Sequence, residues 1–128
     1  MKNKTFKERF TYQDRKNKFN KFKEIYPDRI PVVLQPEQRY KNGSLNPMKK
    51  SFYLFGENVS VCKILQFIRS EIKIGDETAI WLFVNGIVPQ MTSTLNSLYE
   101  NNKDNDGFLY IVYCGELTFG NSTVIHKL

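Results

Sequence analysis

Residues 61–72 limit the folds open to this chain more than any other segment. Five apolar residues of this segment form one stripe: Val61, Ile64, Leu65, Ile68 and Ile72. Intervals of three and four residues place them on one face of an amphipathic helix, and Ser60 is a suitable N-cap for it. A helix with one apolar face must bury that face against another layer. The neighbouring segments therefore decide the fold.

Strand-like segments lie on both sides of this helix. Residues 29–35 and 51–55 precede it, and residues 79–84 and 108–114 follow it; all four are rich in β-branched and aromatic residues. We expect the first two to form a hairpin. The segment 79–84 is the most continuous apolar run, which predicts a central strand, and Asn85-Gly86 predicts a tight turn directly after it.

Two further helices are predicted before the first strand. Thr5 and Glu8 have the spacing of a capping box, which indicates a short helix near residues 5–10. Thr11 and Asp14 repeat the pattern before a longer helix at 12–25, which ends ahead of a proline. The expected apolar face of that longer helix consists of Tyr12, Phe19, Phe22 and Tyr26.

The order of elements gives a fold class. Thr94 predicts the N-cap of a short helix between the last two strands, and residues 115–128 show no periodicity, so we expect an exposed tail there. Strand, strand, helix, strand, short helix, strand is the order of the β-grasp of ubiquitin. We therefore expect an α+β fold, a ubiquitin-like mixed four-stranded sheet with a crossover helix, preceded by two N-terminal helices.

Composition argues against several classes of protein. Apolar residues make up 41% of the chain and charged residues 25%, as in a folded domain. No apolar run approaches the roughly 18 residues of a membrane span, and the basic N-terminus lacks a signal-peptide core. Cys62 and Cys114 are expected to be reduced packing thiols of a cytosolic protein. With one histidine, no phosphate loop and no zinc spacing, we expect no metal, no cofactor and no enzymatic activity.

The net charge of +6 is concentrated at one end. Residues 1–29 contain ten basic and four acidic side chains, whereas the rest of the chain is neutral. Three interpretations stay open for this basic helical segment: attraction to anionic lipid or nucleic-acid phosphate, steering of acidic partner motifs, or a solvated helix face without a partner.

Several motifs resemble one family. They are Tyr26-Pro27-Asp28-Arg29-Ile30-Pro31-Val32, Phe67-Ile68-Arg69, Phe83-Val84-Asn85, Ser97-Leu98-Tyr99, Asp106-Gly107-Phe108-Leu109-Tyr110 and Thr118-Phe119-Gly120. In this order they resemble the autophagy ubiquitin-like modifiers, the GABARAP-like proteins that become linked to lipid on autophagosomes. The resemblance extends from about Phe6 to Gly120.

The resemblance implies a processing site at Phe119-Gly120. In the family a cysteine protease cuts after this glycine, and ubiquitin-like activating and conjugating enzymes join its carboxylate to phosphatidylethanolamine. A residue without Cβ suits a narrow enzyme cleft. The chain would then consist of a helical part (1–28), a β-grasp core (29–120) and a propeptide (121–128). The protein would be cytoplasmic, and on autophagosome or vesicle membranes after lipidation.

The resemblance also implies recognition of cargo receptors. Their short aromatic-x-x-aliphatic motifs would add as a strand to the edge formed by the second strand. The aromatic pocket would be lined by Phe22, Pro31, Val33, Lys50, Leu54 and Phe108. The aliphatic pocket would be lined by Tyr53, Phe55, Val59, Ile64, Phe67 and Ile68. Acidic residues beside the motif would meet Arg29, Arg69 and Lys49.

Other interpretations remain. The apolar residues of both pockets have the spacing of core residues in any protein of this pattern, and the arginines could be solvated surface charges. Phe22 replaces a smaller aliphatic residue of the family, which leaves the peptide preference open. An unconjugated binding module is the first alternative function. A basic RNA-binding domain is the second, although no interleaved basic and aromatic residues support it and we expect no nucleic-acid partner. We expect a monomer.

Overall fold

A computed structural model describes residues 4–38, 45–115, 118–119 and 122–123. Its helices are α1 (Phe6–Arg9), α2 (Tyr12–Ile25), α3 (Val61–Ile72) and α4 (Leu95–Asn102). Its strands are β1 (Arg29–Pro36), β2 (Phe52–Gly56), β3 (Trp81–Phe83), β4 (Leu109–Cys114), β5 (Thr118–Phe119) and β6 (Ser122–Thr123).

The helices begin where their capping residues predict. Thr5 and Glu8 form the complete capping box of α1, and the Thr11 hydroxyl accepts a hydrogen bond from the backbone N–H of Asp14 in α2. Ser60 and Thr94 cap α3 and α4 in the same way. These side chains satisfy backbone donors that have no partner inside the helix.

Four strands form one mixed sheet in the order β2-β1-β4-β3. β1 pairs antiparallel with β2 and parallel with β4, and β3 pairs antiparallel with β4. The expected hairpin and the α+β ubiquitin-like β-grasp fold are therefore confirmed. The prediction of a central strand at residues 79–84 was wrong, because β3 lies at the edge and only Trp81–Phe83 is paired there. Burial of Leu82 and Phe83 under neighbouring elements accounts for the apolar run.

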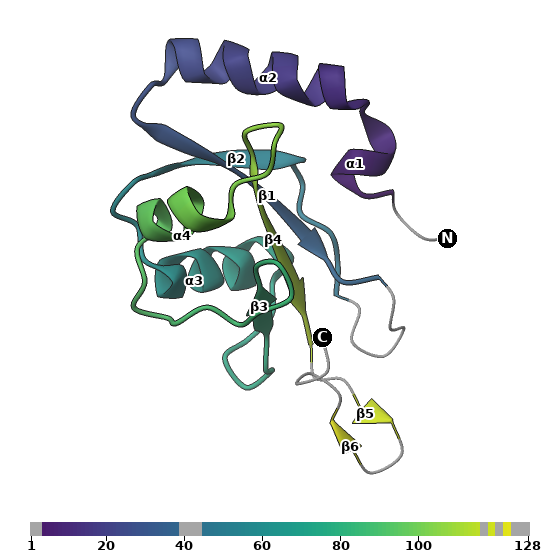
Figure 1. The fold of residues 1–128 in the computed structure, drawn as a ribbon. Helices are drawn as coiled ribbons and strands as arrows, with labels where there is room; N and C mark the ends of the chain where they lie inside the picture. Colours follow the sequence, from purple (N-terminus) through teal and green to yellow (C-terminus); the bar gives the residue numbers. More distant parts are fainter. Residues whose placement is uncertain (1–3, 39–44, 116–117, 120–121, 124–128) are drawn as a thin grey trace.

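The sheet separates two apolar layers, and Figure 1 shows α1 and α2 on one side of it and α3 on the other. The larger cluster joins one face of the sheet to α3 and α4, with Val32, Ile64 and Tyr113 fully buried. The smaller cluster lies under α1 and α2 and is built around Phe6, Val33 and Phe108. Alternate residues of β1 and β4 face opposite layers, as the pleat of a strand requires.

Two local predictions differ in outcome. Asn85 and Gly86 both have positive φ, and Val84 and Ile87 exchange backbone hydrogen bonds across them, so the predicted tight turn is confirmed. The segment expected to be an exposed tail contains the short strands β5 and β6, which pair with each other and were not predicted. A strand of two residues is too short to show the alternation of apolar and polar residues by which strands are predicted from a sequence.

Candidate functional site

β2 presents an edge of the sheet. Its only strand partner among the described residues is β1, so its other side is not covered by a strand. Phe52 pairs with Val33 and Leu54 with Pro31, which places both on the face toward α1 and α2. Tyr53 and Phe55 alternate with them and face α3. An exposed edge with two sets of side chains has the geometry for adding a peptide strand.

The residues predicted for the aliphatic pocket lie together on the α3 side. The ring of Phe67 is 5.0 Å from that of Tyr53 and 5.5 Å from that of Phe55, edge-on in both cases. An open groove of about 600 Å³ begins at the residue after Phe55 and is lined by the segment Gly56–Ser60 and by Lys63. Val59 lines this groove, whereas Ile64 and Ile68 are completely buried in the core. Those two residues are therefore core residues and do not line the groove.

The residues predicted for the aromatic pocket lie on the opposite face. Val33 and Phe108 are 1% and 0% exposed, Pro31 is buried, and Phe22 and Leu54 are partly buried. A residue outside the prediction, Phe52, connects them. Its ring centroid is 5.2 Å from that of Phe22 and 5.1 Å from that of Phe108. Phe52 is two residues before Leu54, and residues two apart in a strand lie on the same face of the sheet. This spacing was the sequence signal that could have identified Phe52.

The basic residues predicted to meet acidic flanks are separated in the structure. Arg29 and Lys49 are exposed, and Lys49 borders a cavity of about 260 Å³ between α1 and the sheet. Lys50, which was predicted for the aromatic pocket, is also exposed and borders the same cavity. Lys4 and Arg9 line the same cavity. Arg69 is on α3 and does not line this cavity.

Arg69 closes the loop after α3. Its Nη1 donates to the carbonyl oxygens of Gly75, at 2.8 Å, and of Thr78, at 2.6 Å. In this structure the side chain therefore holds backbone groups of its own chain. Any contact of Arg69 with an acidic partner would have to use the remaining donors of the guanidinium group.

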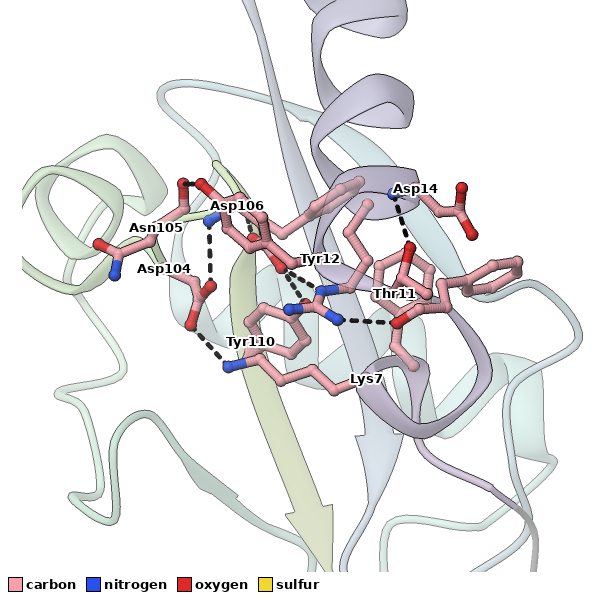
Figure 2. Close-up of polar contacts among 12 residues, drawn as sticks. Lys7, Thr11, Tyr12, Asp14, Asp104, Asn105, Asp106 and Tyr110 are labelled. Carbon is pink, nitrogen blue, oxygen red and sulfur yellow. Dashed lines mark hydrogen bonds and ion pairs between the residues drawn. The ribbon is translucent and has the colours of Figure 1, made fainter.

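The N-terminal helices are attached to the loop at residues 103–108 (Figure 2). Lys7 Nζ donates to Asp104 Oδ1 at 2.7 Å, and the Tyr12 hydroxyl donates to the carbonyl oxygen of Asn105. Beneath them lies a buried ion pair, in which Arg15 Nε is 2.8 Å from Asp106 Oδ2. These contacts hold the N-terminal helices against a loop that is about 90 residues further along the chain.

Asp106 is the centre of this attachment. It is completely buried and accepts hydrogen bonds from the Arg15 guanidinium, the Tyr110 hydroxyl and the backbone N–H of Phe108. Arg15 was absent from the apolar face predicted for α2, yet it is the buried residue of that helix, whereas Tyr12 and Tyr26 are 48% exposed. A buried charge needs a paired charge, and Asp106 supplies it.

Ionisation of the neighbouring groups follows from these contacts. Burial by itself lowers the pKa of Arg15, but the hydrogen bond from Arg15 to Asp106 and the carboxylate charge raise it above its ordinary value. Burial, then the bond to Asp106, raises the pKa of Tyr110. Partial burial raises the pKa of Asp104, but the bonds from Lys7 and from the backbone N–H of Asp106 lower it overall.

Gly107 brings α2 close to the loop. It has φ +98°, and a Cβ there would lie 2.5 Å from ring atoms of Phe19. We expect Gly107→Ala to lower the free energy of unfolding by about 2 kcal/mol or more, from left-handed strain and overpacking together. Gly86→Ala is the control, since Gly86 is exposed with φ 79° and strain alone costs about 1 kcal/mol. Equal losses in urea denaturation would contradict the close packing of α2.

The predicted processing site is only partly described. Gly120 lies outside the described residues, as does the predicted propeptide apart from β6. Phe119 is in β5, where its backbone pairs with that of Ser122. The role of both residues stays a prediction.

Other candidate chemistry is limited in the described ranges. No group of three or more His, Cys, Asp or Glu side chains in those ranges is placed to hold a metal ion. None of the helices found there has both the length and the apolar character needed to cross a membrane. Cys114 is buried, as expected of a packing thiol, whereas Cys62 is exposed on α3, so its expected packing role was wrong.

A mixed sheet crossed by α3, with an uncovered β2 edge and helices attached to the other face, defines a ubiquitin-like protein. A family model described as autophagy protein Atg8, ubiquitin like, matches residues 14–120. The chain therefore belongs to the Atg8 family of autophagy ubiquitin-like proteins. The resemblance found in the motifs is confirmed.

Individual relatives agree with this assignment. Autophagy-related protein 8 of Schizosaccharomyces pombe is 36% identical over 115 residues, covering 90% of this chain and 93% of the relative. Autophagy-related protein 8e of Arabidopsis thaliana is 37% identical over 113 residues, covering 88% and 90%. The crystal structure of Trypanosoma brucei ATG8 superimposes with a TM-score of 0.81 at 26% identity, covering 93% of this chain and 100% of that one.

Proposed function

We propose that this chain is cleaved after Gly120 by a cysteine protease and conjugated through Gly120 to phosphatidylethanolamine by ubiquitin-like activating and conjugating enzymes. The protein is the substrate of this chemistry and not its catalyst. The observation that carries the proposal is the family match, which ends at Gly120 and leaves the eight residues 121–128 beyond it. Residues 1–28 are the helical part, residues 29–120 the β-grasp core and residues 121–128 the propeptide.

The conjugated protein recruits cargo receptors to the autophagosome membrane. The uncovered edge of β2 supports this part of the proposal, because a receptor motif can add there as a strand while its two anchors enter the flanking pockets. The exposed Arg29, Lys49 and Lys50 attract acidic residues beside the motif. Before lipidation the protein is cytoplasmic.

Mass spectrometry of the protein recovered from autophagy-induced cells tests the proposal. We expect a species that ends at Gly120 and a second species with the added mass of phosphatidylethanolamine on the same residue. Recovery of the full-length chain alone would contradict conjugation. The protein would then be an unconjugated binding module, and the peptide-binding edge of β2 would be its function.

A further inference from the structure

The aromatic pocket is closed by the chain's own side chains. Two of its expected walls, Val33 and Phe108, are 1% and 0% exposed, so a ligand ring cannot reach them in this structure. Phe52 covers them. Its ring lies 5.1 Å from Phe108 below and 5.2 Å from Phe22 above, edge-on in both contacts. These are favourable arrangements of aromatic rings.

The position of Phe52 allows it to act as a gate. It is the first residue of β2, it is partly exposed, and it lies on the same strand whose outer edge would receive a peptide. Arg9 of α1 donates a hydrogen bond to the hydroxyl of Ser51, which fixes the chain directly before it. Rotation of one side chain about χ1 exchanges staggered positions without moving the backbone. The ring can thus leave while β2 stays paired.

We propose that Phe52 occupies the aromatic subsite of the unbound protein, and that its ring must move away from Phe22 and Phe108 before an aromatic anchor enters. This proposal rests on the proposed receptor recognition at β2. An aromatic anchor binds only the open fraction of molecules, so its apparent affinity is reduced by that fraction. Phe52 is then the residue that determines how strongly this chain selects an aromatic anchor.

Phe52→Val tests the gate, because valine keeps strand propensity and removes the ring. Removal leaves an apolar space over Phe108, and spaces of this kind bind aromatic ligands. The probe is a fluorescein-labelled synthetic peptide with three aspartates, a tryptophan and a leucine three residues later. By fluorescence polarisation we expect Phe52→Val to bind it about tenfold more tightly than the unmodified protein. A peptide with alanine in place of tryptophan should gain nothing.

Two further variants keep the test valid if Phe52→Val fails to fold. Phe22→Ala removes one of the three ring contacts of Phe52, which are with Phe6, Phe22 and Phe108. It does so from a helix, where alanine is favoured, and should tighten binding about threefold. Phe10→Val is the matched control. Phe10 has extended backbone and packs on Phe6 with centroids 5.2 Å apart, within the same cluster but away from the gate. This control should leave the affinity unchanged.

Proton NMR supplies a readout that does not depend on affinity. We expect nuclear Overhauser contacts between the rings of Phe22 and Phe52 in the free protein and their loss at saturation with the tryptophan peptide. Persistence of those contacts in the complex, or equal affinity of the unmodified protein and Phe52→Val, would overturn the gate and leave receptor recognition intact. If no variant binds either peptide, recognition at β2 is itself overturned, and the gate with it.

Discussion

Replacing Asp106 by alanine is expected to lower the free energy of unfolding by about 3–5 kcal/mol. The variant leaves Arg15, which is only 8% exposed, buried without its charged partner. It also removes the acceptor of the Tyr110 hydroxyl and of the Phe108 backbone N–H. Each buried donor that loses its acceptor adds to the cost. Urea denaturation followed by circular dichroism measures the loss.

Two controls separate the buried pair from general effects of charge. Asp14→Ala removes an exposed aspartate from the first turn of α2 and should cost less than about 1 kcal/mol. The double variant Arg15→Met with Asp106→Leu replaces both charges by apolar groups and should recover much of the lost stability. If Asp106→Ala is no less stable than Asp14→Ala, the attachment of the N-terminal helices does not depend on this pair.

Gly120→Ala is expected to abolish both the trimmed species and the lipid adduct, leaving the full-length chain. A methyl group at this position obstructs entry of the backbone into a narrow protease cleft and crowds the carbonyl that is to be activated. Immunoblotting and mass spectrometry of membrane fractions measure the two products. The fold should be unaffected, which thermal denaturation of the purified variant checks.

Asn121→Ala is the matched control for this substitution. It adds no atom to the glycine and alters only the first residue of the segment proposed to be removed. Processing should continue at a rate within a few-fold of the unmodified chain. Membrane association of Gly120→Ala equal to that of Asn121→Ala would contradict conjugation and favour a binding module that acts through β2 alone.

The sequence predicted those features that depend on neighbours within a few residues. The bounds of α3 were predicted as they are found, because Ser60 caps it and its apolar residues repeat with helical spacing. The turn at Asn85-Gly86 was predicted because these two residues tolerate positive φ. The Atg8 family was predicted from several motifs in order.

The errors concern contacts between distant segments. Residues 79–84 were expected in the middle of the sheet, because burial by helices and burial by strands produce the same apolar run. Arg15 was not assigned to the buried face of α2, because its partner Asp106 is 91 residues away in the chain. Phe52 was left out of the aromatic pocket although its spacing from Leu54 places both on one face of the strand; that its ring lies between Phe22 and Phe108 depends on the packing of α2 on the sheet.

The sequence by itself determined the order of helices and strands, the residues that cap them and the family. These properties follow from hydrogen bonds and side-chain spacing inside single elements. Only the tertiary structure decided that β3 lies at an edge of the sheet, that Asp106 joins the N-terminal helices to the body, and that Phe52 lies between Phe22 and Phe108. Each of these depends on which faces of distant elements meet, and that is set by packing and charge pairing across the whole domain.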